Sequence, residues 1–498
     1  MFRSAYETKL AQPTAAKCHP AGVCQENPMP LLNDVHSALN PTEVLRVERP
    51  STIDELQAGV RAAAREGRAL SCAGGRHAMG GQQFARNKVH LDTTALKSVL
   101  STDCERGLLR IEAGATWPDV IAATHSMATP RGGCWAIRQK QTGVDNVTLG
   151  GSISANAHGR GLAMQPLVED IEDLTLVDAH GEQVLCSRTE NPELFSLAIG
   201  GYGLFGIIYA ATLRLTPRRR VVRLVDVLDL SDGMNAVWRR FGQGCLYGDF
   251  QFVIDPRDPA FLQRGVFACY RPVDDAEPLV VDDASADLQP DAWLRLLGLA
   301  HNDKAAAFRL YAQHYVGTHG NGYWSDTMQL STYLPGYAEF LASHRPPETS
   351  VASAVPETLV IGEHYVPRQR LAQFMEAAGT VLRAQNVEVI YGTIRSILRD
   401  TTSFLPWAKD DFACIVFNLR TRHDDAGRRC TADAFRGLID AALDLDGSFF
   451  LTYHRHATRE QLLRAYPRLP DFLAAKRRYD PEERFVSDWY EHVSAVLR

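Results

Sequence analysis

Glycine is concentrated in four short segments of the first 210 residues, and each segment lies where a predicted strand gives way to a turn. The segments are AGGRHAMGG (73–81), EAGATW (112–117), TLGGSISANAHGRG (148–161) and GGYGLFG (200–206). Glycine permits positive φ and lets backbone N–H groups approach a ligand closely. One such loop says little about function. Four ordered loops on short strands are typical of a site for a large, phosphate-bearing cofactor.

The last segment also matches a dinucleotide fingerprint, G-x-G-x-x-G, at Gly201, Gly203 and Gly206, and Asp226 follows about 20 residues later. The predicted order of elements disagrees with that fingerprint, because a helix precedes these glycines and a strand follows them. A Rossmann site needs a strand, a turn and then a helix whose N-terminus lies under the pyrophosphate. We therefore predict no Rossmann NAD site here.

The elements that must position these loops alternate between helix and strand. Residues 45–75 predict a strand, a helix and a strand, with Ser51 or Thr52 as the helix cap. Residues 225–470 alternate longer strands and helices, which favours an α+β domain with one broad antiparallel sheet. Within them, the acidic segment 272–300 is rich in helix breakers and is predicted to be a surface loop.

Composition excludes several classes of protein. The chain has 498 residues, of which 45% are apolar and 22% charged, so it suits two domains or three and is not disordered, collagenous or a coiled coil as a whole. A formal net charge of −6 indicates no nucleic-acid partner. Ten cysteines without a CxxC pair favour reduced thiols and no zinc site. We find no signal-peptide core and no apolar run of ~20 residues, so we predict a cytoplasmic protein without a membrane span.

The segments AGGRHAMGGQ, TLGGSISANAHGRG and GGYGLFGIIYAATLRL together resemble the FAD-linked oxidase superfamily, the group of vanillyl-alcohol oxidase, p-cresol methylhydroxylase, cytokinin dehydrogenase and the sugar-lactone and alditol oxidases. The resemblance implies a two-subdomain α+β FAD-binding domain of the p-cresol methylhydroxylase type, with the cofactor between the subdomains. The second domain would be a substrate (cap) domain whose broad antiparallel sheet is covered by helices. The organisation expected is an N-terminal arm (1–40), the FAD-binding domain (41–218), the cap domain (219–470) and a C-terminal tail (471–498) that returns to the FAD-binding domain.

The resemblance also assigns cofactor contacts residue by residue. The first loop would wrap the pyrophosphate with its amides, the second would hold the rest of the FAD, and the strand after the last glycines would support its adenine or ribose end. The residues concerned are Ala73, Gly74, Gly75, Arg76, His77, Ala78, Gly80, Gly81, Gln82, Thr142, Asp145, Leu149, Gly150, Gly151, Ser154, His158 and Ile208.

His77 stands where several relatives bond a histidine covalently to the flavin 8α-methyl group. The resemblance therefore implies FAD attached through this imidazole, and the alternative is a loop histidine that donates to a phosphate. Relatives with a second covalent link carry a cysteine shortly before the second glycine pair. This chain has Gly143-Val144-Asp145 there, so we predict a single link.

Because the flavin would carry the redox chemistry, the second domain must orient a substrate, remove a proton and stabilise a developing oxyanion. Glu363 and His364 lie on successive faces of one predicted strand, and Arg395 lies in another that is otherwise apolar. His454 and His456 share one face of a third predicted strand. The catalytic candidates are Glu363, Arg395, His454 and His456, and a buried salt bridge is the structural alternative for the first two. No third ligand accompanies the two histidines, so we predict no metal.

Three further residues are candidates for contact with the flavin. Asn156 and His158 alternate on a predicted glycine-flanked strand, and Trp135 is the third. The predicted function is an FAD-dependent oxidoreductase that oxidises a small alcohol, polyol, lactone or amine by hydride transfer to flavin N5, with oxygen or another carrier as acceptor. The alternatives are a flavin-dependent C=C reductase with a nicotinamide donor, and a flavin-binding protein without catalysis. The sequence specifies neither the substrate nor the oligomeric state.

Overall fold

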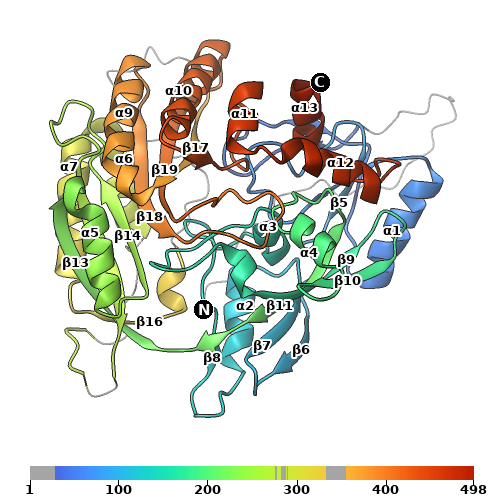
Figure 1. Cartoon of the computed structure of the whole chain (residues 1–498), viewed down its shortest axis with the longest axis horizontal. Helices are drawn as coiled ribbons and strands as arrows, with labels where there is room; N and C mark the ends of the chain where they lie inside the picture. The colour runs from blue at the N-terminus through green and yellow to red at the C-terminus, as the bar shows by residue number, and fades with distance from the viewer. Residues whose placement is uncertain (1–27, 275–276, 282–287, 289, 332–354) are drawn as a thin grey trace, which may run out of the picture.

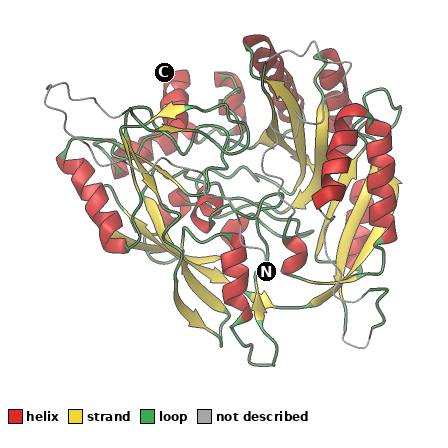
Figure 2. Cartoon of the chain, turned by 180° about the vertical axis from the view of Figure 1, so that it is seen from behind, coloured by secondary structure: helices red, strands yellow, loops and turns green. Residues whose placement is uncertain are grey.

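The computed structural model describes residues 28–274, 277–281, 288, 290–331 and 355–498, and the structural statements below concern those residues. Two groups of helices and sheets lie on either side of a middle that is crowded with loops (Figures 1 and 2). Within the described ranges, no helix combines the length and the apolar character needed to cross a bilayer.

A small parallel sheet contains the strand that leads into the first glycine loop. Its order is β3-β5-β4, and its strands are β3 (Arg46–Glu48), β4 (Leu70–Ala73) and β5 (Val89–Asp92). Helix α1 (Ile53–Arg65) connects β3 to β4, and the Thr52 side chain caps it by accepting a hydrogen bond from the Glu55 N–H. The predicted strand, helix and strand are confirmed. Strand β4 ends at Ala73, where the first glycine loop begins.

A five-stranded antiparallel sheet carries the other glycine segments. Its order is β10-β9-β11-β7-β6, and its strands are β6 (Val99–Asp103), β7 (Leu108–Glu112), β9 (Ile171–Val177), β10 (Gln183–Ser187) and β11 (Ile207–Arg214). The helices that pack around it are α2 (Trp117–His125), α3 (Leu149–Ser154) and α4 (Pro192–Ala198). As predicted, a helix (α4) precedes the glycines of residues 200–206 and a strand (β11) follows them, which is the wrong order for a Rossmann site.

The second part of the chain forms one antiparallel sheet, with eight strands among the described residues, in the order β16-β13-β15-β14-β18-β19-β17-β20. A short pair, β8 (Trp135–Ala136) and β12 (Thr216–Pro217), leads into it. Its strands are β13 (Arg220–Asp229), β14 (Tyr247–Phe252), β15 (Arg264–Pro272), β16 (Gly322–Trp324), β17 (Glu357–Pro367), β18 (Val389–Ile397), β19 (Phe412–Arg422) and β20 (Ser448–Phe449). The helices are α5 (Gly233–Gly242), α6 (Pro290–Asn302), α7 (Lys304–Gly317), α9 (Leu371–Ala384) and α10 (Asp425–Leu443). The predicted α+β architecture with a broad antiparallel sheet and covering helices is confirmed.

Strand β17 separates two environments. His364 faces helices α9 and α10, where its ring lies 6.0 Å from the Phe374 ring and 6.2 Å from the Phe435 ring. Ile361 and Glu363 point to the opposite side and line a cavity. This alternation follows from the two-residue period of a strand, and it places Glu363 and His364 on opposite faces as predicted.

The end of the chain runs beside the small parallel sheet. The last helices are α11 (Arg459–Ala465), α12 (Leu469–Tyr479) and α13 (Asp488–Leu497), drawn in red in Figure 1. Between α12 and α13 the chain pairs with β4: Leu70 donates its N–H to the Arg484 carbonyl at 2.6 Å and accepts from the Val486 N–H at 2.9 Å. Trp489 and Tyr490 are buried beyond this point.

The loop predicted over residues 272–300 is wrong in part. Its last third is the start of α6, where the apolar residues Leu296 and Ala300 are buried. Apolar side chains at helical spacing therefore determine the structure of this stretch more strongly than the acidic residues before it. Parts of the same segment, residues 275–276, 282–287 and 289, lie outside the described residues, as do residues 1–27 of the predicted arm. The described part of the arm includes β1 (Leu31–Leu32), which pairs with β2 (Thr42–Glu43).

Gly362 lies between Ile361 and Glu363 and faces α10. A Cβ at this position would lie 2.0 Å from Cε1 of Phe435, whose ring is fully buried. We therefore expect Gly362→Ala to lower the free energy of unfolding by about 1–3 kcal/mol, measured from the midpoint of denaturant unfolding. The control is Gly379→Ala in α9, where the nearest atom would be 3.5 Å away and alanine favours the helix. Equal midpoints for the two variants would contradict this packing.

Candidate functional site

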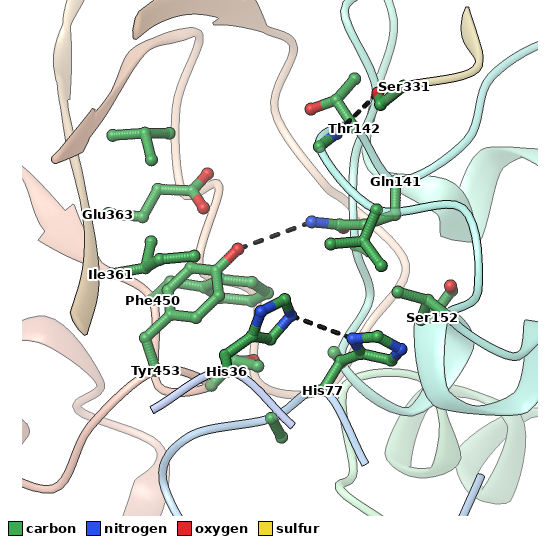
Figure 3. Close-up of a pocket in the computed structure, with 18 of the residues that line it drawn as sticks. His36, His77, Gln141, Thr142, Ser152, Ser331, Ile361, Glu363, Phe450 and Tyr453 are labelled. Carbon is green, nitrogen blue, oxygen red and sulfur yellow. Dashed lines mark hydrogen bonds between the residues drawn. The ribbon is translucent and has the colours of Figure 1, made fainter. Parts of the chain in front are cut away.

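A cavity of about 500 Å³ lies between the N-terminal sheets and the large sheet. Three of the four glycine segments, those of residues 73–81, 148–161 and 200–206, line one side of it, whereas no residue of the segment 112–117 does. Elements β14, β17, β18, β19, α6 and α7 line the other side. In Figure 3, His77 borders this space from one side and Glu363 from the other. Both parts of the chain therefore contribute to one site.

The first glycine loop presents unpaired N–H groups to the cavity. Residues 73–78 all line it, and Arg76 adopts the left-handed backbone conformation with φ of 57°. No described residue accepts a hydrogen bond from the N–H of Gly74, Gly75, Arg76 or Ala78. Successive N–H groups in such a turn form a concave site for an anion.

Gly80 and Gly81, which were expected to continue this loop, do not line the cavity. Met79 and Gly80 donate their N–H groups to the Thr452 carbonyl at 3.1 and 3.0 Å. Gly81 has a φ of 77° and packs against Arg455. The two glycines therefore fasten the first loop to the segment that follows β20.

The third glycine segment (148–161) forms the short helix α3, capped by Thr148. The first amides of this helix are already used within the protein: Leu149 and Gly150 donate to the Ala115 and Ala113 carbonyls, each at 2.7 Å. Leu149 is fully buried in the core and does not reach the cavity. Since these amides have acceptors, the amides that remain open to an anion lie in the first loop and not at the N-terminus of α3.

Asp145 also lies away from the cavity. Its carboxylate binds Nζ of the buried Lys140 at 2.7 Å and accepts from the Ser331 N–H at 3.1 Å. The ion pair between Asp145 and Lys140 therefore stabilises the loop of residues 142–145 on the side away from the cavity. Of the remaining residues expected to bind cofactor, those that line the cavity are Gln82, Thr142, Gly150, Gly151, Ser154 and Ile208.

The glycine-flanked strand predicted around Asn156 and His158 is wrong. Asn156 follows α3 in a left-handed conformation with φ of 48°, and its amide donates to Asp400 at 2.8 Å. His158 bonds to Glu363 instead of lining the cavity. Trp135 lies apart from the cavity, where its Nε1–H donates to the Cys104 carbonyl at 3.0 Å.

Unsatisfied polar atoms on the cavity wall indicate which ligand fits. Gln82 Oε1, Gln83 Oε1 and Thr142 Oγ1 are buried and have no hydrogen-bond partner in the described part of the chain. An unpaired buried acceptor costs about 1–3 kcal/mol, so these oxygens call for N–H or O–H donors. The amides of the first loop call for an anion. FAD offers both, because its pyrophosphate is anionic and its hydroxyl and ring N–H groups are donors.

His77 contacts a second histidine on the cavity wall. Its Nδ1 lies 2.9 Å from Nε2 of His36, which comes from the described part of the arm (Figure 3). Burial, and next the neighbouring His36, lower the pKa of His77 to about 3. The imidazole is therefore neutral near pH 7. No motif marks His36, so its place in the site was not predictable from sequence.

Glu363 is the buried carboxylate of the site. Its Oε1 lies 2.5 Å from His158 Nε2 and 2.8 Å from Cys414 Sγ. Burial by itself would raise the pKa of Glu363. The charge and hydrogen bond of His158, helped by Cys414 and Arg395, outweigh burial and lower that pKa to about 2. Glu363 is therefore ionised at neutral pH.

Arg395 lines the same cavity from β18. Its guanidinium makes no ion pair with any described acidic residue, and its Nε is buried without a hydrogen-bond partner among them. The salt bridge with Glu363, weighed above as the structural alternative, is therefore not formed. A guanidinium that faces a cavity without a partner is suited to bind an oxygen anion.

The structure does not bring His454 and His456 together with Glu363. Strand β20 ends at Phe449, so these histidines lie in a loop and not in the predicted strand. Their rings lie 4.9 Å apart, and the His454 ring stacks on Phe435 at 4.4 Å. Burial lowers both pKa values, that of His456 to about 4. Neither ring lines the cavity. Both rings pack against α10 instead.

Other polar residues of the cavity were not predicted. Tyr453 lines it in place of the neighbouring histidines, with its hydroxyl 3.5 Å from Gln141 Nε2 (Figure 3). Arg160 and Asp249 line it as well, 3.6 Å apart. For Asp249 a signal was available, because it is a charged residue within an apolar strand, as Arg395 is.

Comparison with known proteins identifies the N-terminal part. The model of the FAD binding domain family matches residues 44–187. An uncharacterized oxidoreductase from the fasciation locus of Rhodococcoides fascians is 33% identical over 178 residues, which are 35% of this chain and 38% of that protein. Cytokinin dehydrogenase 7 of Oryza sativa subsp. japonica is 32% identical over 203 residues, 38% of this chain and 35% of the relative.

The mitochondrial L-galactono-1,4-lactone dehydrogenase of Brassica oleracea is 25% identical over 225 residues, 44% of this chain and 36% of the relative. The chain thus spans between 35% and 38% of the length of these three relatives. The resemblance seen in the glycine segments is confirmed there, because residues 44–187 match the FAD binding domain family.

Proposed function

We propose that this chain is an FAD-dependent oxidoreductase that oxidises a small alcohol, polyol, lactone or amine. The observation that carries the proposal is the shared cavity. On one wall it has the amides of Gly74, Gly75, Arg76 and Ala78, which find no acceptor among the described residues, and on the other the ionised Glu363. Bound FAD would supply the acceptor for a hydride from the substrate carbon. The names of two relatives, both dehydrogenases, agree with this class of reaction.

The residues that would hold FAD are those that line the N-terminal wall. The amides of residues 74–78 would bind its pyrophosphate, as an anion nest does. The acceptor oxygens of Gln82, Gln83 and Thr142 would pair with its donors. Gly150, Gly151, Ser154 and Ile208 complete this wall without bulky polar groups.

Glu363 and Arg395 would act on the substrate. Oxidation of a C–H bond beside oxygen or nitrogen releases a proton from the hydroxyl or amine as the hydride leaves. The carboxylate of Glu363 would accept that proton. The guanidinium of Arg395 would bind the substrate oxygen and stabilise the negative charge that develops on it.

We further propose that FAD is bonded covalently through His77. The imidazole lines the cavity, and its low pKa keeps it neutral, which a nucleophile requires. The single link predicted from sequence stands as part of this proposal.

The covalent link can be tested by acid precipitation of the pure protein, followed by flavin absorbance in the pellet and in the supernatant. We expect flavin in the wild-type pellet and loss of essentially all pellet flavin in His77→Ala. The matched control is His125→Ala, which removes a histidine that binds Asp326 away from the cavity. Pellet flavin that persists in His77→Ala would refute the link. Protein that is colourless and does not take up added FAD would refute the cofactor assignment itself.

The role of Glu363 can be tested once a substrate is found by screening sugars, polyols, lactones, phenols and amines for dye reduction and oxygen consumption. We expect Glu363→Gln to lower kcat/KM about 10²- to 10⁴-fold, the usual size of a general-base effect, with flavin content unchanged. The control is Glu357→Gln on the same strand, whose carboxylate binds Arg420 at 2.8 Å outside the cavity. Equal activity in both variants would contradict the proposal. Anaerobic bleaching of the flavin by NADPH would instead favour the reductase.

A further inference from the structure

Behind Glu363 lies a buried group of three side chains. His158 Nε2 is 2.5 Å from Glu363 Oε1, Cys414 Sγ is 2.8 Å from the same oxygen, and Sγ is 3.4 Å from Nε2. The exposed fractions of His158, Glu363 and Cys414 are 3%, 2% and 0%. Both contacts are made to Oε1, and no described residue donates to Oε2. Glu363 lines the cavity while His158 and Cys414 do not, so Oε2 is the oxygen left for a ligand.

The hydrogen-bond partner of His158 Nδ1 determines which atoms of His158 and Glu363 can carry a proton. His158 Nδ1 lies 2.9 Å from the Gly159 carbonyl, which only accepts hydrogen bonds, so Nδ1 carries a proton. The 2.5 Å contact between Nε2 and Oε1 requires one more proton between them. That proton lies either on His158, which makes an imidazolium and a carboxylate, or on Glu363, which makes two neutral groups.

The surroundings favour the imidazolium and the carboxylate. Cys414 points its thiol at Oε1, and burial followed by the charge of Glu363 raises the pKa of that thiol, so it remains a donor. A donor at Oε1 stabilises the charged form of a carboxylate. Arg395 adds positive charge on the cavity side. Burial raises the pKa of Glu363, but the charge and hydrogen bond of His158, and after them Cys414 and Arg395, lower it to about 2.

The spacing of the group is that of side chains in direct hydrogen-bond contact and is tighter than the spacing of ligands around a metal ion. Two ligand atoms on one zinc ion lie roughly 3 Å or more apart, because bonds of about 2.0–2.3 Å meet at tetrahedral angles. The distances of 2.5 and 2.8 Å to Glu363 Oε1 are shorter than that and lie within hydrogen-bond reach.

The His158 ring is held in place on its other side as well. Its centroid lies 5.2 Å from that of Trp407, whose Nε1–H donates to the Asn156 carbonyl at 2.9 Å. Trp407 in turn stacks on Tyr365 at 4.3 Å. The imidazole therefore has one orientation, with Nε2 directed at Glu363.

We propose that His158 is a positioning residue: it keeps the shared proton on its own ring, holds Oε1 of Glu363, and so leaves Oε2 as the ionised oxygen that faces the cavity. The effect of this arrangement on turnover rests on the proposed function of Glu363. The position of the proton is independent of that function. The other titratable groups that act on Glu363, or on which it acts, are Arg395, Cys414, Tyr202, His364, Tyr365, Tyr453 and Tyr466.

The proton arrangement can be tested without a substrate, by infrared difference spectroscopy of the flavin-loaded protein. We expect wild type minus Glu363→Gln to show an ionised carboxylate and no protonated carboxyl band at neutral pH. In His158→Gln we expect the carboxyl to titrate roughly 1 to 3 pH units higher, because an opposite charge has been removed. The control is His364→Phe, which alters the neighbouring buried histidine on the other face of β17. It should leave the Glu363 band unchanged.

A protonated carboxyl band from Glu363 in the wild type would overturn the proposal, and that result needs no histidine variant. An unchanged titration in His158→Gln would overturn it too.

The kinetic consequence is a second readout. A depressed pKa keeps the carboxylate ionised as the pH falls toward about 2, so Glu363 should cause no acidic limb of kcat/KM in wild type above that pH. In His158→Gln the raised pKa should bring this limb to roughly pH 3 to 5, with activity recovered at higher pH. A shifted infrared titration without a shifted limb would leave the positioning intact and refute Glu363 as the base. A shift in both supports both proposals.

Discussion

Strand β17 has to satisfy two different surroundings at once, and the site depends on how it does so. One face is pressed against α9 and α10, where Gly362 leaves space for the Phe435 ring and His364 packs among aromatic rings. The other face carries Ile361 and Glu363 to the cavity. Because a strand alternates its side chains, a fixed helix-side packing leaves Glu363 one direction only. The packing of β17 against α9 and α10 therefore fixes the direction of the Glu363 carboxylate.

The cofactor side of the cavity is held by segments far apart in the chain. The first glycine loop is fastened through Met79 and Gly80 to Thr452, and β4, which leads into it, pairs with Arg484 and Val486. A loop whose amides must stay free for a ligand cannot be held by those amides. Instead, backbone groups on either side of the loop hold it in place, through hydrogen bonds to the C-terminal part of the chain.

Local sequence patterns predicted most helices and strands. The predictions were wrong where contacts with distant residues override the local preference. The α1 unit, α4, β11 and the broad sheet were predicted from period, caps and glycines. The segment from Asn156 to His158 was expected to be a strand but turns after α3, because Asp400 and Glu363 hold its side chains. His454 was expected in the site but stacks on α10, since the chain after Phe449 leaves the sheet.

The sequence by itself determined the chemistry on offer: glycine loops that free backbone amides, a histidine at position 77, and charged residues within apolar strands. These follow from residue type and spacing, which are local. Only the tertiary structure decided which groups meet. It joined His36 to His77 and placed His158 and Cys414 behind Glu363. It also left Arg395, in the same cavity, without an ion-pair partner in the described part of the chain. These contacts join residues that are 41, 51 and 205 positions apart. They are set by how the sheets and loops pack, and no local pattern records them.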